Sequence, residues 1–175
     1  ANCTADSMEF LERAMTAQEL GAGGIMAAPG LLGLSIIREL SSAPDFHLPI
    51  FLHPCFSGPL VLSADSGVSP FCYYGQFSRL AGADAAIFTS FGGRFPFTEE
   101  VCRKICDGTE TEMGGLRSIF PVPSGGMKWQ LFKKMVQVYG PDAIFLVGGA
   151  LLTESDDLTA NMHFYFEKLN EAVNK

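Results

Sequence analysis

The sequence predicts an α/β protein built on parallel strands, and it favours a (β/α)₈ barrel. Three observations support this prediction: short apolar runs recur along the chain, helical patterns separate them, and the last two runs each lead to a glycine pair. Runs this uniformly apolar suit strands that are buried on both faces. An open doubly wound sheet is the alternative, but no G-x-G-x-x-G turn supports a dinucleotide-binding form of it.

Five strands are expected, each bounded by glycine or proline and separated from the next by a helix. They cover residues 24–28, 50–53, 85–89, 119–122 and 143–147. The order of elements is α-β-α-β-α-β-α-β-α-β-α, with no internal linker and no low-complexity segment. The chain therefore reads as one unit of 175 residues.

Three of the helices have recognisable N-caps. Asp6 or Ser7 caps a helix that ends at the glycines of 21–24, Ser69 caps a helix with proline at its first position, and Thr98 caps a third. Further helices are expected at residues 31–40, 128–139 and 158–173.

Composition narrows the classes of function. The formal net charge of −7 and the isoelectric point near 4.9 exclude a basic nucleic-acid surface, which needs clustered Lys and Arg. No apolar stretch approaches the roughly 20 residues of a membrane span, and no targeting signal is visible, so we expect no membrane partner and a cytoplasmic location. An acidic protein that binds an anion must do so with local groups such as backbone amides or a single Arg.

Cysteines and histidines do not form a metal-binding pattern. The five cysteines are scattered and odd in number, so we expect reduced thiols, with Cys102 and Cys106 on one helix face as core or surface residues. His47 and His163 are expected to be structural. The three histidines lack the companion ligands of a zinc site.

The glycine pairs predict a phosphate site. Ser124-Gly125-Gly126 and Gly148-Gly149 follow apolar runs about one βα unit apart. A glycine at the end of a buried strand lets backbone N–H groups approach a ligand, and adjacent barrel strands hold one phosphate in this way. Ser124 lacks the surroundings of a nucleophile, and hydrogen bonding to substrate is its expected role.

His53 and Arg94 are the candidate catalytic residues. His53 ends a strand and precedes a polar loop, where a barrel places acids and bases; the alternative is a histidine bonded within the barrel rim. Arg94 lies in the glycine- and phenylalanine-rich segment 89–97, which has the composition of a loop that closes over substrate. We expect Arg94 to stabilise an enolate or carboxylate oxygen there, or to hold a phosphate. The alternative is that Arg94 is a surface residue.

Several motifs resemble the RuBisCO large-chain superfamily, and within it the RuBisCO-like proteins. They are His-Pro-Cys-Phe-Ser-Gly at 53–58, Leu-Ala-Gly-Ala-Asp at 80–84, Gly-Gly-Arg-Phe at 92–95, Pro-Val-Pro-Ser-Gly-Gly at 121–126 and Gly-Gly at 148–149. The resemblance covers essentially residues 1–175 and implies the C-terminal part of the barrel domain, strands four to eight with their helices. It also implies that the N-terminal domain and strands one to three are absent from this chain.

By resemblance, each candidate residue takes a role. His53 corresponds to the family's strand-five histidine that contacts the substrate's central hydroxyls, and Arg94 stands where the carboxylases' loop lysine stands. Ser124 corresponds to the strand-seven serine that binds substrate. The glycines correspond to backbone amides that bind a substrate phosphate; they are Gly125, Gly126, Gly148 and Gly149.

Departures from the carboxylases refine the expected reaction. Pro54 replaces an arginine that grips a second phosphate, and Ile87 replaces the strand-six histidine, so CO₂ fixation is not expected. The resemblance implies Mg²⁺-assisted enolisation of a phosphorylated keto-sugar or keto-acid. The protein is then an isomerase or enolase of a methylthio-sugar phosphate, or a decarboxylase of a 3-oxo sugar-acid phosphate. The alternative is a catalytically silent phosphate-binding or regulatory protein.

The resemblance places the metal half of the site outside this chain. The family's lysine and acidic Mg²⁺ ligands would lie upstream of Ala1, so no metal ligand is expected here. The resemblance also implies a homodimer, or a complementing N-terminal segment, because family sites form at subunit boundaries. A Schiff-base aldolase is a weaker alternative, since none of the predicted strands ends in lysine.

Overall fold

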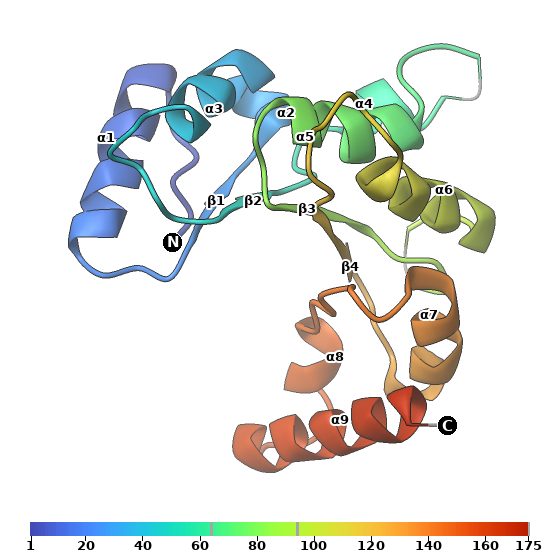
Figure 1. Cartoon of the computed structure of the whole chain (residues 1–175). Coiled ribbons are helices and arrows are strands. Elements are labelled where there is room, and N and C mark those ends of the chain that lie inside the picture. Colours follow the sequence, from blue (N-terminus) through green and yellow to red (C-terminus); the bar gives the residue numbers. More distant parts are fainter. Residues whose placement is uncertain (64, 94, 175) are drawn as a thin grey trace.

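The computed structural model describes residues 1–63, 65–93 and 95–174, and its centre is a parallel sheet. The strands are β1 (Ile25–Ala27), β2 (Ile50–Leu52), β3 (Ala85–Thr89) and β4 (Phe120–Ser124), arranged side by side in chain order (Figure 1). A doubly wound sheet reverses its strand order at a switch point, whereas a barrel does not. The unreversed order confirms the predicted α/β fold as part of a singly wound barrel.

Four of the five predicted strands are confirmed, and the fifth prediction is wrong. Residues 143–147 are not a strand, although the Ile144 and Leu146 N–H groups donate to the carbonyls of Pro121 and Pro123 at 3.0 and 3.1 Å. In a parallel ladder, the same residues of β4 would return N–H bonds to this segment. Proline has no N–H to return, so the segment runs beside β4 without a complete ladder.

Helices separate the strands as predicted, and two of them, α1 and α6, begin at predicted N-caps. The longer ones are α1 (Ser7–Glu19), α3 (Leu34–Ser41), α6 (Glu99–Glu110), α7 (Phe132–Tyr139) and α9 (Leu158–Val173); the short ones are α2 (Pro29–Leu32), α4 (Gly58–Val61), α5 (Ser78–Leu80), α8 (Gly149–Leu152) and the 3₁₀ turn η2 (Trp129–Leu131). Asp6 caps α1 by accepting from the Glu9 N–H at 3.1 Å, and Thr98 caps α6 by accepting from the Val101 N–H at 3.3 Å.

Two helix predictions need correction. The helix expected at 31–40 is interrupted at Gly33, whose φ of 81° belongs to the left-handed region, so α2 and α3 form instead. The helix that Ser69 begins is a π-helical segment, η1 (Phe71–Phe77), before it continues as α5. A Cβ on Gly75 would lie 2.4 Å from the carbonyl carbon of Gly108, so η1 and α6 pack backbone to backbone.

The strands alternate between two apolar layers. Ile25 and Ala27 of β1 pack into the layer beneath the helices, while Met26 between them packs on the opposite face with Ile87 and Val122. Of the two readings left open by the sequence, core or surface thiols, Cys102 and Cys106 of α6 are core thiols, since both are buried. Among the described residues, no helix is long and apolar enough to cross a membrane.

Candidate functional site

The two glycine turns lie next to each other at the carboxyl edge of the sheet. Ser124 ends β4 in register with Thr89, the last residue of β3. The bond from the Leu146 N–H to the Pro123 carbonyl brings the end of the segment 143–147 beside the end of β4. The pairs that follow, Gly125-Gly126 and Gly148-Gly149, therefore come after neighbouring segments at this edge.

These turns present unused backbone donors. Within the described chain, the N–H groups of Gly125, Gly126, Gly148 and Gly149 donate to no acceptor. Gly126 and the second pair are exposed. Gly125 and Gly126 have φ of 83° and 91°, a conformation that glycine adopts without strain. Four accessible donors on adjacent turns match the acceptor-only oxygens of a phosphate.

The loop after β3 packs on the first of these turns. A Cβ on Gly93 would lie 2.2 Å from the Gly125 carbonyl oxygen, and a Cβ on Gly125 would lie 2.9 Å from the ring of Phe95. Any side chain at either glycine would force the loop and the turn apart. Arg94, between Gly93 and Phe95, lies outside the described residues, so its proposed role stays a prediction.

The Ser124 hydroxyl donates a hydrogen bond within the fold. Its hydroxyl donates to the Phe88 carbonyl oxygen at 2.9 Å, and its side chain is half-buried. The hydroxyl oxygen keeps lone pairs that can accept a hydrogen bond. Ser124 therefore suits the acceptance of a ligand hydroxyl rather than nucleophilic attack.

His53 lies directly after β2, where its N–H donates to the Ala27 carbonyl at 2.8 Å. The ring Nδ1 accepts from the Cys55 N–H at 3.1 Å, which requires Nδ1 without a proton. Partial burial disfavours the imidazolium and lowers the pKa of His53 below its ordinary value. In the neutral ring Nε2 carries the proton, so His53 can donate a hydrogen bond to a ligand oxygen.

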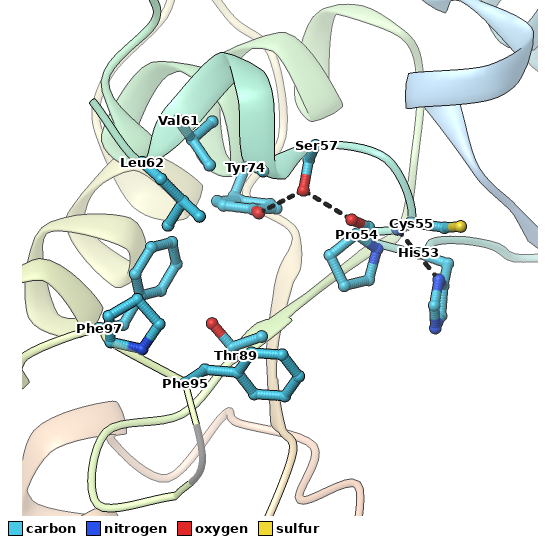
Figure 2. A pocket seen from close by; sticks show the side chains of 12 residues that line it. His53, Pro54, Cys55, Ser57, Val61, Leu62, Tyr74, Thr89, Phe95 and Phe97 are labelled. Carbon is cyan, nitrogen blue, oxygen red and sulfur yellow. Dashed lines mark hydrogen bonds between the residues drawn. The ribbon is translucent and has the colours of Figure 1, made fainter.

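A cavity of about 290 Å³ opens beside His53 (Figure 2). Val61 and Leu62, from α4 and its C-terminal cap, form one wall, Phe95 and Phe97 from the loop after β3 form another, and Thr89 and Tyr74 also face it. Segment 89–97, which includes Thr89, Phe95 and Phe97, was expected from the sequence to close over substrate, whereas sequence reasoning missed Val61, Leu62 and Tyr74 as site components. Nothing local marks Tyr74, which η1 brings in from a helix.

The remaining titratable candidates lie away from this edge. His47 precedes β2, where its N–H donates to the Gln18 side-chain oxygen at 2.7 Å, and His163 is exposed on α9. Across residues 1–63, 65–93 and 95–174, no group of three His, Cys, Asp or Glu side chains could hold a metal ion. The described residues therefore do not fit Mg²⁺ as a complete site.

The sequence of this chain is similar to those of curated proteins. No protein-family model matches the chain. It is 36% identical over 148 residues to the 5-methylthioribulose-1-phosphate isomerase of Rhodospirillum rubrum, covering 82% of this chain and 37% of that protein. It is 32% identical over 155 residues to the 2,3-diketo-5-methylthiopentyl-1-phosphate enolase of Exiguobacterium sibiricum, covering 89% of this chain and 39% of the enolase.

A solved structure supports the same relationship. The rubisco-like protein of Alicyclobacillus acidocaldarius superposes on 99% of this chain with a TM-score of 0.87 and 28% identity, over 46% of its own length. The chain belongs to the RuBisCO-like protein family. The Pyrococcus horikoshii Rubisco, 20% identical, shares the fold over 99% of this chain and 42% of its own, with a TM-score of 0.91.

This RuBisCO-like chain spans about two fifths of the length of the curated relatives named here. Its four strands match part of the RuBisCO barrel domain, which confirms the predicted fold class. The relatives carry isomerase and enolase names.

Proposed function

We propose that this chain supplies the substrate-binding side of a RuBisCO-like active site that enolises a phosphorylated keto-sugar or keto-acid. The observation that carries the proposal is the set of four unused N–H donors on the adjacent turns Gly125-Gly126 and Gly148-Gly149. Donors of this kind bind a phosphate without a lysine or arginine. This mode of binding suits a chain of net charge −7.

The other residues of the edge then hold the sugar. The Nε2–H of His53 donates to an oxygen of the substrate backbone, and the Ser124 hydroxyl accepts from a substrate hydroxyl. Hydrogen bonds that strengthen as negative charge develops on a carbonyl oxygen lower the barrier to enolisation. Arg94 is proposed to add a positive charge near that oxygen or near the phosphate.

Two relatives suggest the substrate class. The isomerase and the enolase named above act, by their names, on methylthio-sugar phosphates. Isomerisation, enolisation and decarboxylation of a 3-oxo acid all proceed through an enolate, so the binding side is compatible with each. When bound, Mg²⁺ would stabilise that enolate, and we propose that its ligands come from a complementing segment or from the partner in a homodimer.

Solvent exchange tests the proposal in the complete native protein. With Mg²⁺ and 5-methylthioribulose 1-phosphate or 2,3-diketo-5-methylthiopentyl 1-phosphate in D₂O, we expect loss of a carbon-bound proton signal beside the carbonyl, followed by ¹H NMR. A Ser124→Ala variant should slow this exchange, because it removes the acceptor at the end of β4.

A second outcome would support the alternative, a catalytically silent protein, over the enzyme. If either phosphate ester binds, as measured by calorimetry, but no deuterium enters it, the protein is a phosphate-binding or regulatory member of the family. Exchange that continues unchanged in a Gly125→Val variant would contradict the placement of the phosphate on these turns.

A further inference from the structure

The turn that follows β2 is strained at one residue. Phe56 has a φ of 63°, in the left-handed region that a bulky side chain rarely adopts, and it is 66% exposed. A Cβ on Gly30 would lie 2.6 Å from the Cys55 carbonyl oxygen, so α2 packs closely against the same turn. Strain of this kind persists only where the surroundings hold the backbone in place, and it is frequent at functional sites.

A chain of hydrogen bonds holds this turn and ends at His53 (Figure 2). The Tyr74 hydroxyl lies 2.7 Å from Ser57 Oγ, which donates to the Pro54 carbonyl oxygen at 2.6 Å. Since the Ser57 proton is used, Tyr74 donates to Ser57. The Pro54 carbonyl and the Cys55 N–H belong to one planar peptide group, and that N–H donates to His53 Nδ1 at 3.1 Å. This peptide group therefore connects Tyr74 to His53.

The connection favours one tautomer of His53. Hydrogen bonds in a chain polarise one another, so a bond to the Pro54 carbonyl oxygen makes the N–H of the same peptide group a better donor. A stronger bond from the Cys55 N–H to Nδ1 favours the neutral ring with its proton on Nε2. The proposed function requires this tautomer, because Nε2–H is the group that donates to a substrate oxygen.

Tyr74 is held in place by its own packing. It is 5% exposed, and its ring centroid lies 6.3 Å from that of Phe88 in β3 and 6.1 Å from that of Phe97. It belongs to η1, which packs backbone to backbone on α6, and π-helical turns are frequent at functional sites. Burial raises the pKa of Tyr74, so its hydroxyl stays neutral and can donate.

We propose that Tyr74 is a positioning residue, which acts through Ser57 and the Pro54–Cys55 peptide group to hold His53 in the Nε2–H tautomer that donates to the substrate. The inference rests on the proposed function for what His53 does in the reaction. The tautomer itself is a property of the protein without substrate, so it can be measured separately.

Tyr74→Phe tests this role, and Tyr73→Phe is its matched control. Both tyrosines are buried in η1, and within the described chain the Tyr73 hydroxyl makes no hydrogen bond. Each substitution therefore removes one hydroxyl and keeps the ring, but only Tyr74→Phe removes a bond to the turn.

Nitrogen NMR measures the tautomer in the complete native protein with ¹⁵N-labelled histidine. At about pH 8 the neutral ring dominates, and the ¹⁵N shifts report which ring nitrogen carries the proton. The His53 signals are those that disappear in His53→Asn. We expect Tyr74→Phe to shift the Nδ1 signal toward that of a protonated nitrogen, and Tyr73→Phe to leave it unchanged.

Kinetics show whether the tautomer matters to the reaction. The substrate is 5-methylthioribulose 1-phosphate or 2,3-diketo-5-methylthiopentyl 1-phosphate, whichever undergoes proton exchange. Tyr74→Phe should lower kcat about two- to tenfold, the range that one neutral hydrogen bond supplies, with a smaller change in KM. Ser57→Ala removes two bonds of the chain and should lower kcat at least as much. Adding Tyr74→Phe to Ser57→Ala should then change neither kcat nor the tautomer further, whereas additive effects would contradict a connection through Ser57.

The two readouts separate this inference from the function on which it rests. An unchanged His53 tautomer in Tyr74→Phe, an equal change in Tyr73→Phe, or a changed tautomer with an unchanged kcat would overturn the inference, while proton exchange by the wild type still supported the proposed function. A changed tautomer in a protein whose wild type exchanges no substrate proton would reject the proposed enzyme and leave only the hold of Tyr74 on His53.

Discussion

At the amino ends of the strands, polar side chains bond to the surrounding backbone, whereas at the carboxyl ends backbone and side-chain groups are left open. The Asp84 carboxylate, just before β3, accepts from the Ile50 N–H at 2.9 Å. Gln18 donates to the Asp45 carbonyl and accepts from the His47 N–H, both at 2.7 Å. These hydrogen bonds hold in place the segments that lead into the strands.

Arg79 is the strongest example at the amino edge. It is 4% exposed, and its guanidinium donates to the carbonyls of Arg117, Leu116, Gly108 and Thr111, the backbone that leads into β4. A planar group with five donors can organise such a connection without a carboxylate partner. No local sequence pattern around Arg79 indicates this role.

The contrast separates stability from binding. A polar group whose hydrogen bonds are all made inside the fold contributes to the free energy of unfolding, and it has nothing left for a ligand. The glycine donors, Thr89 Oγ1 and His53 Nε2 have the reverse character. Substitutions at the two edges should therefore affect different measurements, as barrels generally divide stability and activity between their two ends.

The largest expected effect is at the amino edge. Arg79→Met should lower the free energy of unfolding by about 3 kcal/mol, because hydrogen bonds from a charged group contribute about 1.5–3 kcal/mol each and the carbonyls lose their donor. Urea unfolding followed by circular dichroism measures it. Affinity for a phosphate ester at the other edge should be unchanged in the folded fraction.

Arg38 offers a matched control for Arg79. It is exposed and donates one hydrogen bond, to the Leu80 carbonyl at 2.5 Å. Arg38→Met should change the free energy of unfolding by about 0.5 kcal/mol or less, as surface substitutions usually do. Similar losses in the two variants would contradict the structural role assigned to Arg79.

The next effect is at the carboxyl edge and appears mainly in binding. Gly125→Ala places a Cβ 2.9 Å from the Phe95 ring at a φ of 83° and should weaken binding of 5-methylthioribulose 1-phosphate about tenfold or more, because the turn must move. The left-handed conformation itself should cost about 1–2 kcal/mol of stability. Calorimetry and urea unfolding measure the two quantities.

Gly140 separates strain from binding in this experiment. Its φ is 79°, and a Cβ there would meet nothing within 4 Å, so Gly140→Ala introduces backbone strain outside the turns without a steric clash. We expect a loss of stability and an unchanged dissociation constant. Equal losses of affinity in the two variants would show that strain alone, and not the phosphate turn, causes the effect.

The candidate residues at the carboxyl edge could be predicted from the sequence better than the polar contacts at the amino edge. Strand ends and glycine pairs are local patterns, so His53, Ser124 and the glycine turns could be proposed from the chain alone, and their roles stay predictions. The contact of the Phe95 ring with Gly125 and the hydrogen bonds from Arg79 join residues that are 29 or more positions apart in the sequence. The absence of the fifth strand also depends on a second segment, since the prolines that prevent a complete ladder with residues 143–147 lie in β4.

The smallest expected effect concerns the protonation of His53. Because burial lowers its pKa, the unfolded chain binds a proton more readily than the folded one, so unfolding is favoured as the pH falls. The contribution of neutral His53 to stability is full above the ordinary pKa of about 6.5 and is lost as the pH falls through the lowered value. In His53→Asn the amide oxygen can still accept from the Cys55 N–H without titrating. The stability of the variant relative to the wild type should therefore rise between about pH 7.5 and pH 5, as measured by urea unfolding, and a constant difference across that range would contradict the lowered pKa.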